Sequence, residues 1–436
     1  MSKRYLIIFI IAIFILSITS VVLATDVHTT TSIINGVTVK WEYNIDKSNQ
    51  IIDLKCTNST ELTGNITIPA TLDGLNVVSL GNGAFSGATN ITKVVIPSSI
   101  KKIAKNSFLK CTGLTAVELG SVEEINEAAF ADCTGLTSVK IPKTLKSGPT
   151  IIDEYVFKNC TNLTTITLED GLEVIPTRVL AGTNITEIKI PSSVKTIDSQ
   201  AFYSCKSLKK VDLGSVENIK TAAFANCTGL TSIKIPKTLK SGPTIIDEYV
   251  FKNCTNLTTI TLEDGLEVIP TRVLAGTNIT EIKIPSSVKK IEQDAFSNCK
   301  GLTKIEIYDG VKDIYGLDSK EDKVFTNHND NLTIYCYKDS MAARYAINHN
   351  IKYVYLTKNE EDKNNTVNNT TTSNTTSKDN TIANTSNKTN TVNDTTIKGG
   401  VLPKTGIGFG LIITIITLVG GGIYTFFKYN NLKDIK

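Results

Sequence analysis

The sequence predicts an α/β-type repeat solenoid, built mostly from short parallel strands and loops with few helical turns. Two observations predict this class. The segment from Lys140 to Lys195 recurs without a change from Lys234 to Lys289, an offset of 94 residues. Within it, a shorter unit of 22 to 27 residues repeats, and each unit carries a short apolar strand pattern. A period of this length is typical of solenoids, because one coil cannot bury its apolar side alone whereas stacked coils can.

The shorter unit is marked by a Phe or Leu that follows Ala, Val or Ser. This landmark recurs at Phe85, Phe108, Phe130, Phe157, Leu180, Phe202, Phe224, Phe251, Leu274 and Phe296. In most units a Cys follows three residues later, and then Leu-x-x-Ile/Val-x-Ile/Leu. Within one such strand, Val139 and Ile141 should point to one side and Lys140 to the other. Pro142 should end the strand, because it withholds a backbone N–H.

These residues resemble the repeat of BspA-like leucine-rich repeat proteins, Ala-Phe-x-x-Cys-x-x-Leu-x-x-Ile-x-Ile-Pro. The resemblance covers about Asn65 to Ile307 and implies a leucine-rich repeat solenoid with a cap at each end. The sequence departs from the repeat at Leu180 and Leu274, where Leu replaces Phe and Thr takes the Cys position, so we expect a thinner core there. The 27-residue units carry an insertion, KTLKSGPTIIDE, which we expect to bulge as a loop.

The N-terminus has the composition of an export signal. Lys3 and Arg4 precede an unbroken apolar stretch, 5–16, and residues of small or modest size lead up to Ala24. This pattern predicts that signal peptidase cuts between Ala24 and Thr25. An uncleaved membrane anchor is the alternative.

The C-terminus carries the pentapeptide Leu402-Pro403-Lys404-Thr405-Gly406, followed by an uncharged stretch and a basic tail. The uncharged stretch is long enough to cross a bilayer as a helix, and the lysines of the tail favour the cytoplasmic side. The three features together resemble the sortase cell-wall sorting signal of Gram-positive surface proteins. The resemblance implies that a sortase cuts between Thr405 and Gly406 and joins the chain to peptidoglycan, so the membrane is a partner only through the sorting segment before cleavage. A plain single-span protein is the alternative.

The predicted organisation of the chain follows from these features. It comprises a signal peptide (1–24), an N-terminal cap region (25–64), the solenoid (65–330), a C-terminal cap (331–356), an Asn/Thr/Ser-rich stalk (357–401), the LPKTG motif (402–406), a transmembrane helix (407–427) and a basic cytoplasmic tail (428–436). The internal duplication occupies about 121–214 and 215–308. The C-terminal cap should contain a strand, a short helix with Ala342, Ala343 and Ala346 on one side, and a last strand. The stalk has almost no apolar residues and is predicted to be disordered, with O-glycosylation left open.

The charge distribution argues against a nucleic-acid partner. The formal net charge is +4. Lys3 and Arg4 contribute +2 and the segment 428–436 another +2, so residues 25–405 sum to zero. A nucleic-acid-binding protein concentrates positive charge on its folded body instead.

The cysteines and histidines give no sign of catalysis. Seven of the nine cysteines share one repeat position: Cys111, Cys133, Cys160, Cys205, Cys227, Cys254 and Cys299. One position in successive coils predicts buried free thiols stacked along the core, with disulfides or a metal site as the alternatives. No Cys-x-x-Cys pair supports zinc, and His28, His328 and His349 lie near no nucleophile or carboxylate signature. We therefore expect no catalytic residues, no cofactor and no enzymatic activity.

The outward-facing strand residues form a ladder along the predicted solenoid. It consists of Lys140, Thr167, Lys189, Asp212, Lys234, Thr261, Lys283 and Glu306, beside a second row rich in Thr. A solenoid presents such a row as one long face, and mixed charges favour a protein or glycan ligand over a polyanion. The family resemblance implies an adhesin on the extracellular face of a Gram-positive bacterium, covalently attached to the wall. The alternatives are a passive structural or shielding component and an enzyme with cryptic chemistry.

Overall fold

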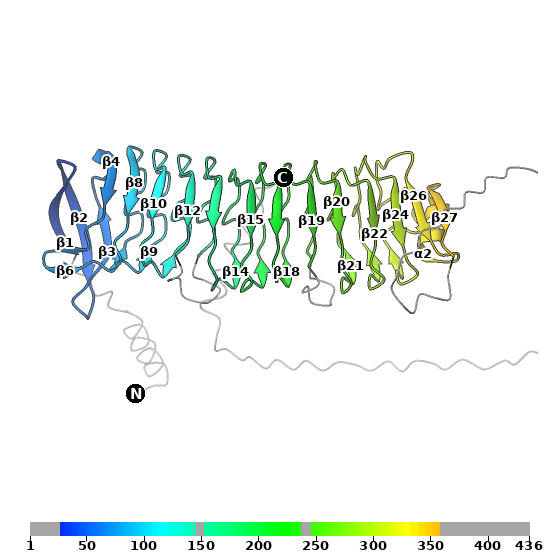
Figure 1. Cartoon of the computed structure of the whole chain (residues 1–436), viewed down its shortest axis with the longest axis horizontal. Helices are drawn as coiled ribbons and strands as arrows, with labels where there is room; N and C mark the ends of the chain where they lie inside the picture. The colour runs from blue at the N-terminus through cyan, green and yellow to red at the C-terminus, as the bar shows by residue number, and fades with distance from the viewer. Residues whose placement is uncertain (1–26, 143, 145–151, 237–245, 358–436) are drawn as a thin grey trace, which may run out of the picture. The chain divides into compact units, whose positions relative to one another are not determined.

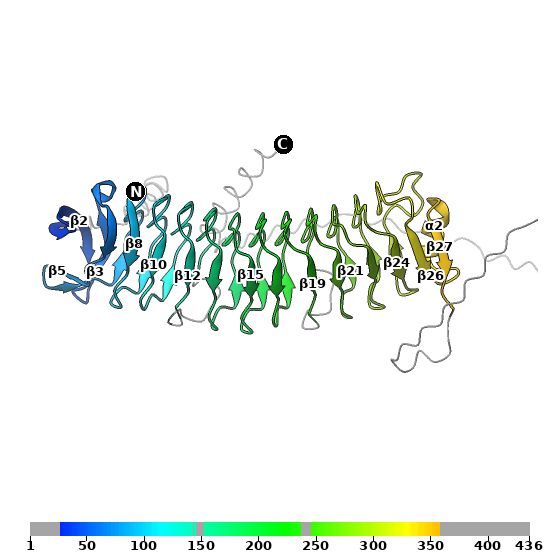
Figure 2. The ribbon, with the colours of Figure 1, turned by 45° about the horizontal axis from the view of Figure 1, so that its top comes forward.

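The computed structural model describes residues 27–142, 144, 152–236 and 246–357. They form a solenoid of stacked coils, so the predicted fold class is confirmed. In most coils the chain makes two short strands, and the strands of successive coils lie side by side in two columns, seen as the upper and lower rows of Figure 1. Turning the molecule, as in Figure 2, shows the same succession of coils from β2 to β27.

The first column contains the longer strands and forms the outward ladder. Its members are β4 (Gly64–Thr67), β8 (Ile91–Val95), β10 (Ala116–Glu118), β12 (Ser138–Lys140), β13 (Thr165–Thr167), β15 (Glu187–Lys189), β17 (Lys210–Asp212), β19 (Ser232–Lys234), β20 (Thr259–Thr261), β22 (Glu281–Lys283), β24 (Lys304–Ile307), β26 (Thr333–Cys336) and β27 (Lys352–Tyr355). The bonded pairs in this column are parallel. Val139 and Ile141 are buried while Lys140 is exposed, as the alternation predicts.

The second column returns the chain to the core. It contains β3 (Ile51–Cys56), β7 (Ser79–Leu80), β9 (Lys102–Ile103), β11 (Glu124–Ile125), β14 (Val174–Ile175), β16 (Thr196–Ile197), β18 (Asn218–Ile219), β21 (Val268–Ile269), β23 (Lys290–Ile291) and β25 (Asp313–Ile314). One apolar residue of each short strand points inward, as Ile197 does beside the preceding Val194. Two columns facing one another therefore enclose a continuous core.

The landmark rings fill the third side of that core. The rings of Phe85, Phe108, Phe130 and Phe157 stack with centroids 5.0 to 5.6 Å apart. A tight turn lies on each side of every landmark from Phe108 to Phe296. The residue two before the landmark and the residue two after it both have positive φ. The residue two after it is often Asn or Gly, which adopt this conformation readily.

The column of stacked rings extends beyond the landmark residues at both ends, and two leucines interrupt it in between. Trp41 packs edge-on against Phe85, and Phe325 stacks on Phe296 at 5.4 Å. Leu180 and Leu274 take the place of a ring. Beside Leu180 lies an apolar space of ≈10 Å³, about the volume of one water probe, so the core is slightly thinner there.

The cysteines of the repeat form a second ordered column. All nine are buried free thiols in the structure. Each repeat thiol donates to the carbonyl of the landmark residue in the preceding coil, as Cys111 Sγ does to Phe85 O at 3.1 Å and Cys227 Sγ to Phe202 O at 3.1 Å. Thr183 and Thr277 fill the position in other coils and donate to the landmark carbonyl of their own coil. The thiols are thus small apolar groups that also satisfy buried carbonyls.

The N-terminal end is closed by an antiparallel sheet that does not follow the repeat. Strands β1 (His28–Ile34) and β2 (Val37–Ile45) pair antiparallel, and β2 pairs with β3, which begins the second column. Trp41 is 1% exposed and its Nε1 donates to Ser32 Oγ at 2.8 Å. A short 3-10 helix, η1 (Ser59–Glu61), and the hairpin of β5 (Thr71–Leu72) with β6 (Leu75–Asn76) complete this end. The first coil is therefore covered by a sheet rather than left as an open edge.

The C-terminal end is closed by the helix α2 (Met341–Asn348) between β26 and β27. Ser340 caps the helix by accepting from the backbone N–H of Ala343. The helix buries Ala342, Ala343 and Ala346 together with Tyr345. The alanines let the helix approach the last coil closely, while the Tyr345 ring meets Phe325 at 6.1 Å.

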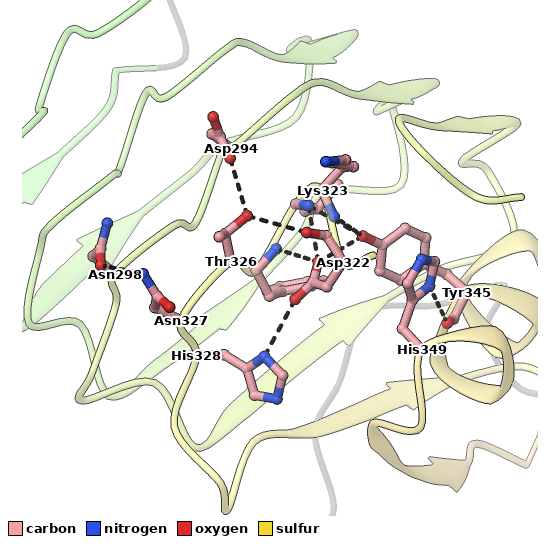
Figure 3. A network of polar contacts seen from close by, with 11 residues as sticks. Asp294, Asn298, Asp322, Lys323, Thr326, Asn327, His328, Tyr345 and His349 are labelled. Carbon is pink, nitrogen blue, oxygen red and sulfur yellow. Dashed lines mark hydrogen bonds and ion pairs between the residues drawn. The ribbon is translucent and has the colours of Figure 1, made fainter. Parts of the chain in front are cut away.

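A polar network fixes the loop before this cap, as Figure 3 shows. Asp322 accepts hydrogen bonds from Tyr345 Oη at 2.7 Å, from the backbone N–H of Val324 and of Phe325, and from His328 Nδ1 at 3.2 Å. Burial opposes ionisation of Asp322, but these donors outweigh it and lower its pKa. The hydrogen bond to Asp322 raises the pKa of His328.

The two ends of the chain lie outside the described residues. These include the signal peptide with its cleavage site, the stalk, Leu402 to Gly406, the apolar stretch 407–427 and the tail. Most of each predicted insertion loop also lies outside them. Within the part that the structure describes, no helix is long and apolar enough to cross a membrane.

Candidate binding face

The outward surface of the first column, from β4 to β27, is called the binding face below. The ladder side chains named from sequence lie on it. Seven of them are exposed and Glu306 is half-buried. Parallel pairing places Lys189 beside Asp212, and Lys283 beside Glu306.

The neighbouring row of threonines is engaged within the solenoid. Thr137 Oγ1 donates to Thr115 O at 3.2 Å, and Thr164 and Thr258 donate in the same way to the coil before them. These hydroxyls join consecutive coils, so their recurrence has a structural reason. The charged ladder positions are the better candidates for contact with a ligand.

Two grooves open on the binding face at equivalent positions of the duplication. The N-terminal groove, ≈650 Å³, lies over β13, β15 and β17 and includes Thr167, Lys189 and Asp212. The C-terminal groove, ≈760 Å³, lies over β20, β22 and β24 and includes Thr261, Lys283 and Glu306. The structure therefore brings six of the eight ladder residues together in two sets of three, while Lys140 and Lys234 line neither groove.

Both grooves open where the bonded ladder of the first column is interrupted. Among the described strands of the first column, three neighbouring pairs are not joined by the β-sheet hydrogen-bond pattern. They are β13 and β15 under the N-terminal groove, β20 and β22 under the C-terminal groove, and β17 and β19 between the two grooves. Between β13 and β15 a backbone hydrogen bond is kept just before the two strands begin, where Thr186 N donates to Thr164 O at 3.4 Å. Beyond it, Leu168 is half-buried where the equivalent Ile190 is buried, and Gly171 adopts φ +116°. The segment 168–171, Leu-Glu-Asp-Gly, therefore differs in backbone conformation from the equivalent Ile-Pro-Ser-Ser of 190–193, and Gly171 permits the positive φ.

Charge pairs and tyrosines organise the C-terminal groove. Lys304 Nζ lies 2.8 Å from Glu306, and Tyr308 Oη donates to Glu306 at 3.2 Å. Burial opposes ionisation of Glu306, but the bonds from Lys304 and Tyr308 prevail and lower its pKa. Lys283 Nζ lies 5.2 Å from the Tyr308 ring centroid, within range of a cation–π contact.

Three tyrosines of this region were missed by the sequence reasoning. Tyr308 and Tyr337 line the groove with ring centroids 6.1 Å apart, and Lys304 Nζ lies 5.1 Å from the Tyr335 ring. Tyr335 pairs with Glu306 and so continues the ladder. The sequence did carry a signal for them, because the alternation of buried and outward-facing residues continues through 304–307 and 333–336. The tyrosines were missed because they lie after the second identical copy, which ends at Lys289.

The thiols in the core behind this face are held protonated. Burial raises the pKa of Cys160 and of Cys254 to about 12, so these thiols stay protonated and are poor nucleophiles. Within the described residues, no group of three or more His, Cys, Asp and Glu side chains is placed to hold a metal ion. The face itself presents hydrogen-bond donors beside acceptors, as at Lys189 with Asp212 and Lys283 with Glu306.

A parallel-strand solenoid with a charged outer face is the architecture of a leucine-rich repeat scaffold. The BspA type leucine-rich repeat region family matches residues 41–150, 144–244 and 238–340. The chain belongs to this family. Repeat solenoids of this kind are typically protein-interaction scaffolds without catalytic activity.

Solved structures similar to this chain come from several bacteria. A leucine-rich repeat protein from Bacteroides ovatus is 18% identical, with 76% of this chain and 98% of that chain covered and a TM-score of 0.43. A leucine rich cell surface protein from Faecalibacterium prausnitzii is 24% identical, with 73% and 97% covered and a TM-score of 0.43. The pneumococcal vaccine antigen PcpA is 17% identical, with 76% and 99% covered and a TM-score of 0.44. The comparison with curated proteins gave no match.

Proposed function

We propose that this chain is an exported adhesin, covalently attached to the wall of a Gram-positive bacterium, that binds an extracellular protein or glycan through its binding face. The observation that carries the proposal is the pair of matched grooves on one face. Each combines lysines, carboxylates and hydroxyls over a rigid floor, and the duplication has produced the arrangement twice. Two like sites on one rigid body can engage one ligand surface with avidity.

The sequence at the two ends supports the location. An export signal at 1–24 and an LPKTG motif ahead of an apolar stretch and a basic tail are the features that a sortase substrate needs. Sortase and peptidoglycan are thus the partners proposed for attachment. The polar stalk would hold the binding face away from the wall.

Attachment is tested by treating cells with a muramidase. The chain should be released still bonded to wall fragments, and Thr405→Ala should shift it to the membrane fraction. Lys404→Ala is the matched control, because Lys404 occupies the variable third position of the motif and does not form part of the cut bond. Release of an unmodified chain by detergent alone would contradict wall attachment.

Binding is tested by attachment of cells to matrix proteins, mucins and other bacteria. Reversing the charge in both grooves, with Lys189→Glu and Lys283→Glu, should reduce attachment. Lys252→Glu, on a landmark turn away from the face, serves as the control. Failure to attach to any surface would favour the passive structural role.

A further inference from the structure

The two grooves are natural variants of one another. The linings that come from the first two strands of each groove are identical, because Thr261, Asp264 and Glu281 repeat Thr167, Asp170 and Glu187 at the offset of 94 residues. The copies diverge after Lys289. From there the C-terminal groove acquires two tyrosines. Tyr308 stands where the other copy has Gly214, and Tyr337 lies two residues after the ladder residue Tyr335, as Pro236 lies two residues after Lys234.

The added tyrosines form a fixed aromatic wall. Tyr308 and Tyr337 are both half-buried, with their rings tilted by 37°. Tyr308 is held through its hydroxyl by Glu306 and through its ring by Lys283. A side chain held in this way loses little conformational entropy when a ligand arrives.

The other groups of the groove favour a polyhydroxylated ligand over a protein surface. Its lining carries Glu263, Asp264, Glu281, Glu306 and Asp309 against Lys283 and Lys304, a formal charge of −3. The cores of protein–protein interfaces are depleted in Lys, Glu and Asp, so a charged floor fits a protein partner poorly. Carboxylates accept several hydrogen bonds each, which suits the closely spaced hydroxyls of a sugar.

We propose that the C-terminal groove is a binding site for neutral saccharides. The apolar C–H face of a sugar ring packs against the wall of Tyr308 and Tyr337, and its hydroxyls bond to Asp264 and Glu281 on the opposite side. The negative charge of the groove disfavours acidic sugars. This inference rests on the proposed function and names the ligand class of one of its two grooves. The N-terminal groove shares the lining from its first two strands but lacks the aromatic wall, so it binds such sugars more weakly.

The test uses cells that display the full chain. They are incubated with polymer conjugates carrying galactose, mannose or N-acetylglucosamine, and with a sialylated conjugate. At least one neutral conjugate should bind, and Tyr308→Ala and Tyr337→Ala should each weaken it at least about tenfold, as truncation of an aromatic anchor does. Tyr308→Phe, which keeps the ring, should retain most of the binding. Tyr203→Ala, at a tyrosine that is 37% exposed and lines neither groove, is the control.

Display of each variant is measured with an antibody to the chain. If an alanine variant is poorly displayed, Asp264→Asn and Glu281→Gln replace it, since both residues are exposed. These variants should also weaken binding of the neutral conjugate, and unchanged binding would overturn the site.

Three other results overturn the saccharide site: binding that survives both alanine substitutions, a preference for the sialylated conjugate, or capture of matrix proteins with no conjugate bound. In the last case the proposed adhesin function stands. If neither conjugates, proteins nor cells are bound, both proposals fail.

Discussion

Phe224→Ala removes one ring from the stack in the second copy of the duplication. The side chain is fully buried, and its centroid lies 4.9 Å from that of Phe202 and 5.8 Å from that of Phe251. Truncating a buried Phe costs about 3–5 kcal/mol, and loss of two stacked pairs places this case toward the upper end. Phe224→Leu reproduces the residue that the chain has at Leu180, so it should cost less than about 2 kcal/mol.

The assay is unfolding of residues 25–357 in urea, and two spectroscopic signals monitor it. Circular dichroism reports all coils, while fluorescence reports Trp41, the single tryptophan, in the N-terminal sheet. Stability in a solenoid is a sum of coil and interface terms, so the alanine variant should lower the dichroism midpoint more than the fluorescence midpoint. A loss below about 1 kcal/mol would refute the contribution of this ring to the core. The same shift in both signals would refute the idea that its effect is confined to the neighbouring coils.

Three further predictions follow from the packing and the polar network. In the native protein the thiols should not react with a thiol reagent, and all nine should react in denaturant, because burial keeps groups such as Cys160 protonated; rapid native reaction would show that the column is open. His328, whose pKa is raised, stabilises the cap fully below its unfolded pKa of about 6.5, and this contribution is lost as pH rises through the folded value. Asp322, whose pKa is lowered, contributes fully above about pH 3.9, and its contribution is lost as pH falls through the folded value. The difference in urea midpoint between wild type and His328→Asn should therefore be largest near pH 5 to 6 and smaller at pH 8; a flat difference would contradict the ion pair. Gly113→Ala would drive a Cβ into the backbone oxygen of Thr89 in the preceding coil and should cost about 1–3 kcal/mol, whereas an unchanged melting temperature would mean that the coils are loosely packed.

The fold was predictable because its signals are local and repeated. The alternation at Val139, Lys140 and Ile141 fixes which side of a strand faces the core, and the structure confirms it. A cysteine at the same position of successive coils implied a buried column before any contact was known. The carbonyl that each thiol bonds could not be inferred, because it belongs to the preceding coil.

The ends of the solenoid and the grooves were less accessible to this reasoning. The antiparallel sheet around Trp41 has no repeat to compare with. Phe325 was not recognised as a landmark, because it lies 29 residues after Phe296 and His328 stands at the position of the repeat Cys. The ladder residues were identified one by one, but their grouping into grooves depends on the backbone conformation of the segment 168–171, which strand periodicity does not encode.

The exact repeat of 140–195 at 234–289 also bears on inheritance. Identical segments at a fixed offset are substrates for unequal crossing-over, which deletes or adds one block of 94 residues. Each product joins a coil to a sequence that it already contacts in the parent, so no new interface has to arise. One block spans four strand steps, or roughly 19 Å at ~4.8 Å per step. A population could therefore vary how far the solenoid extends, and how many grooves of the N-terminal kind it carries, in single genetic events that leave the contacts between coils intact.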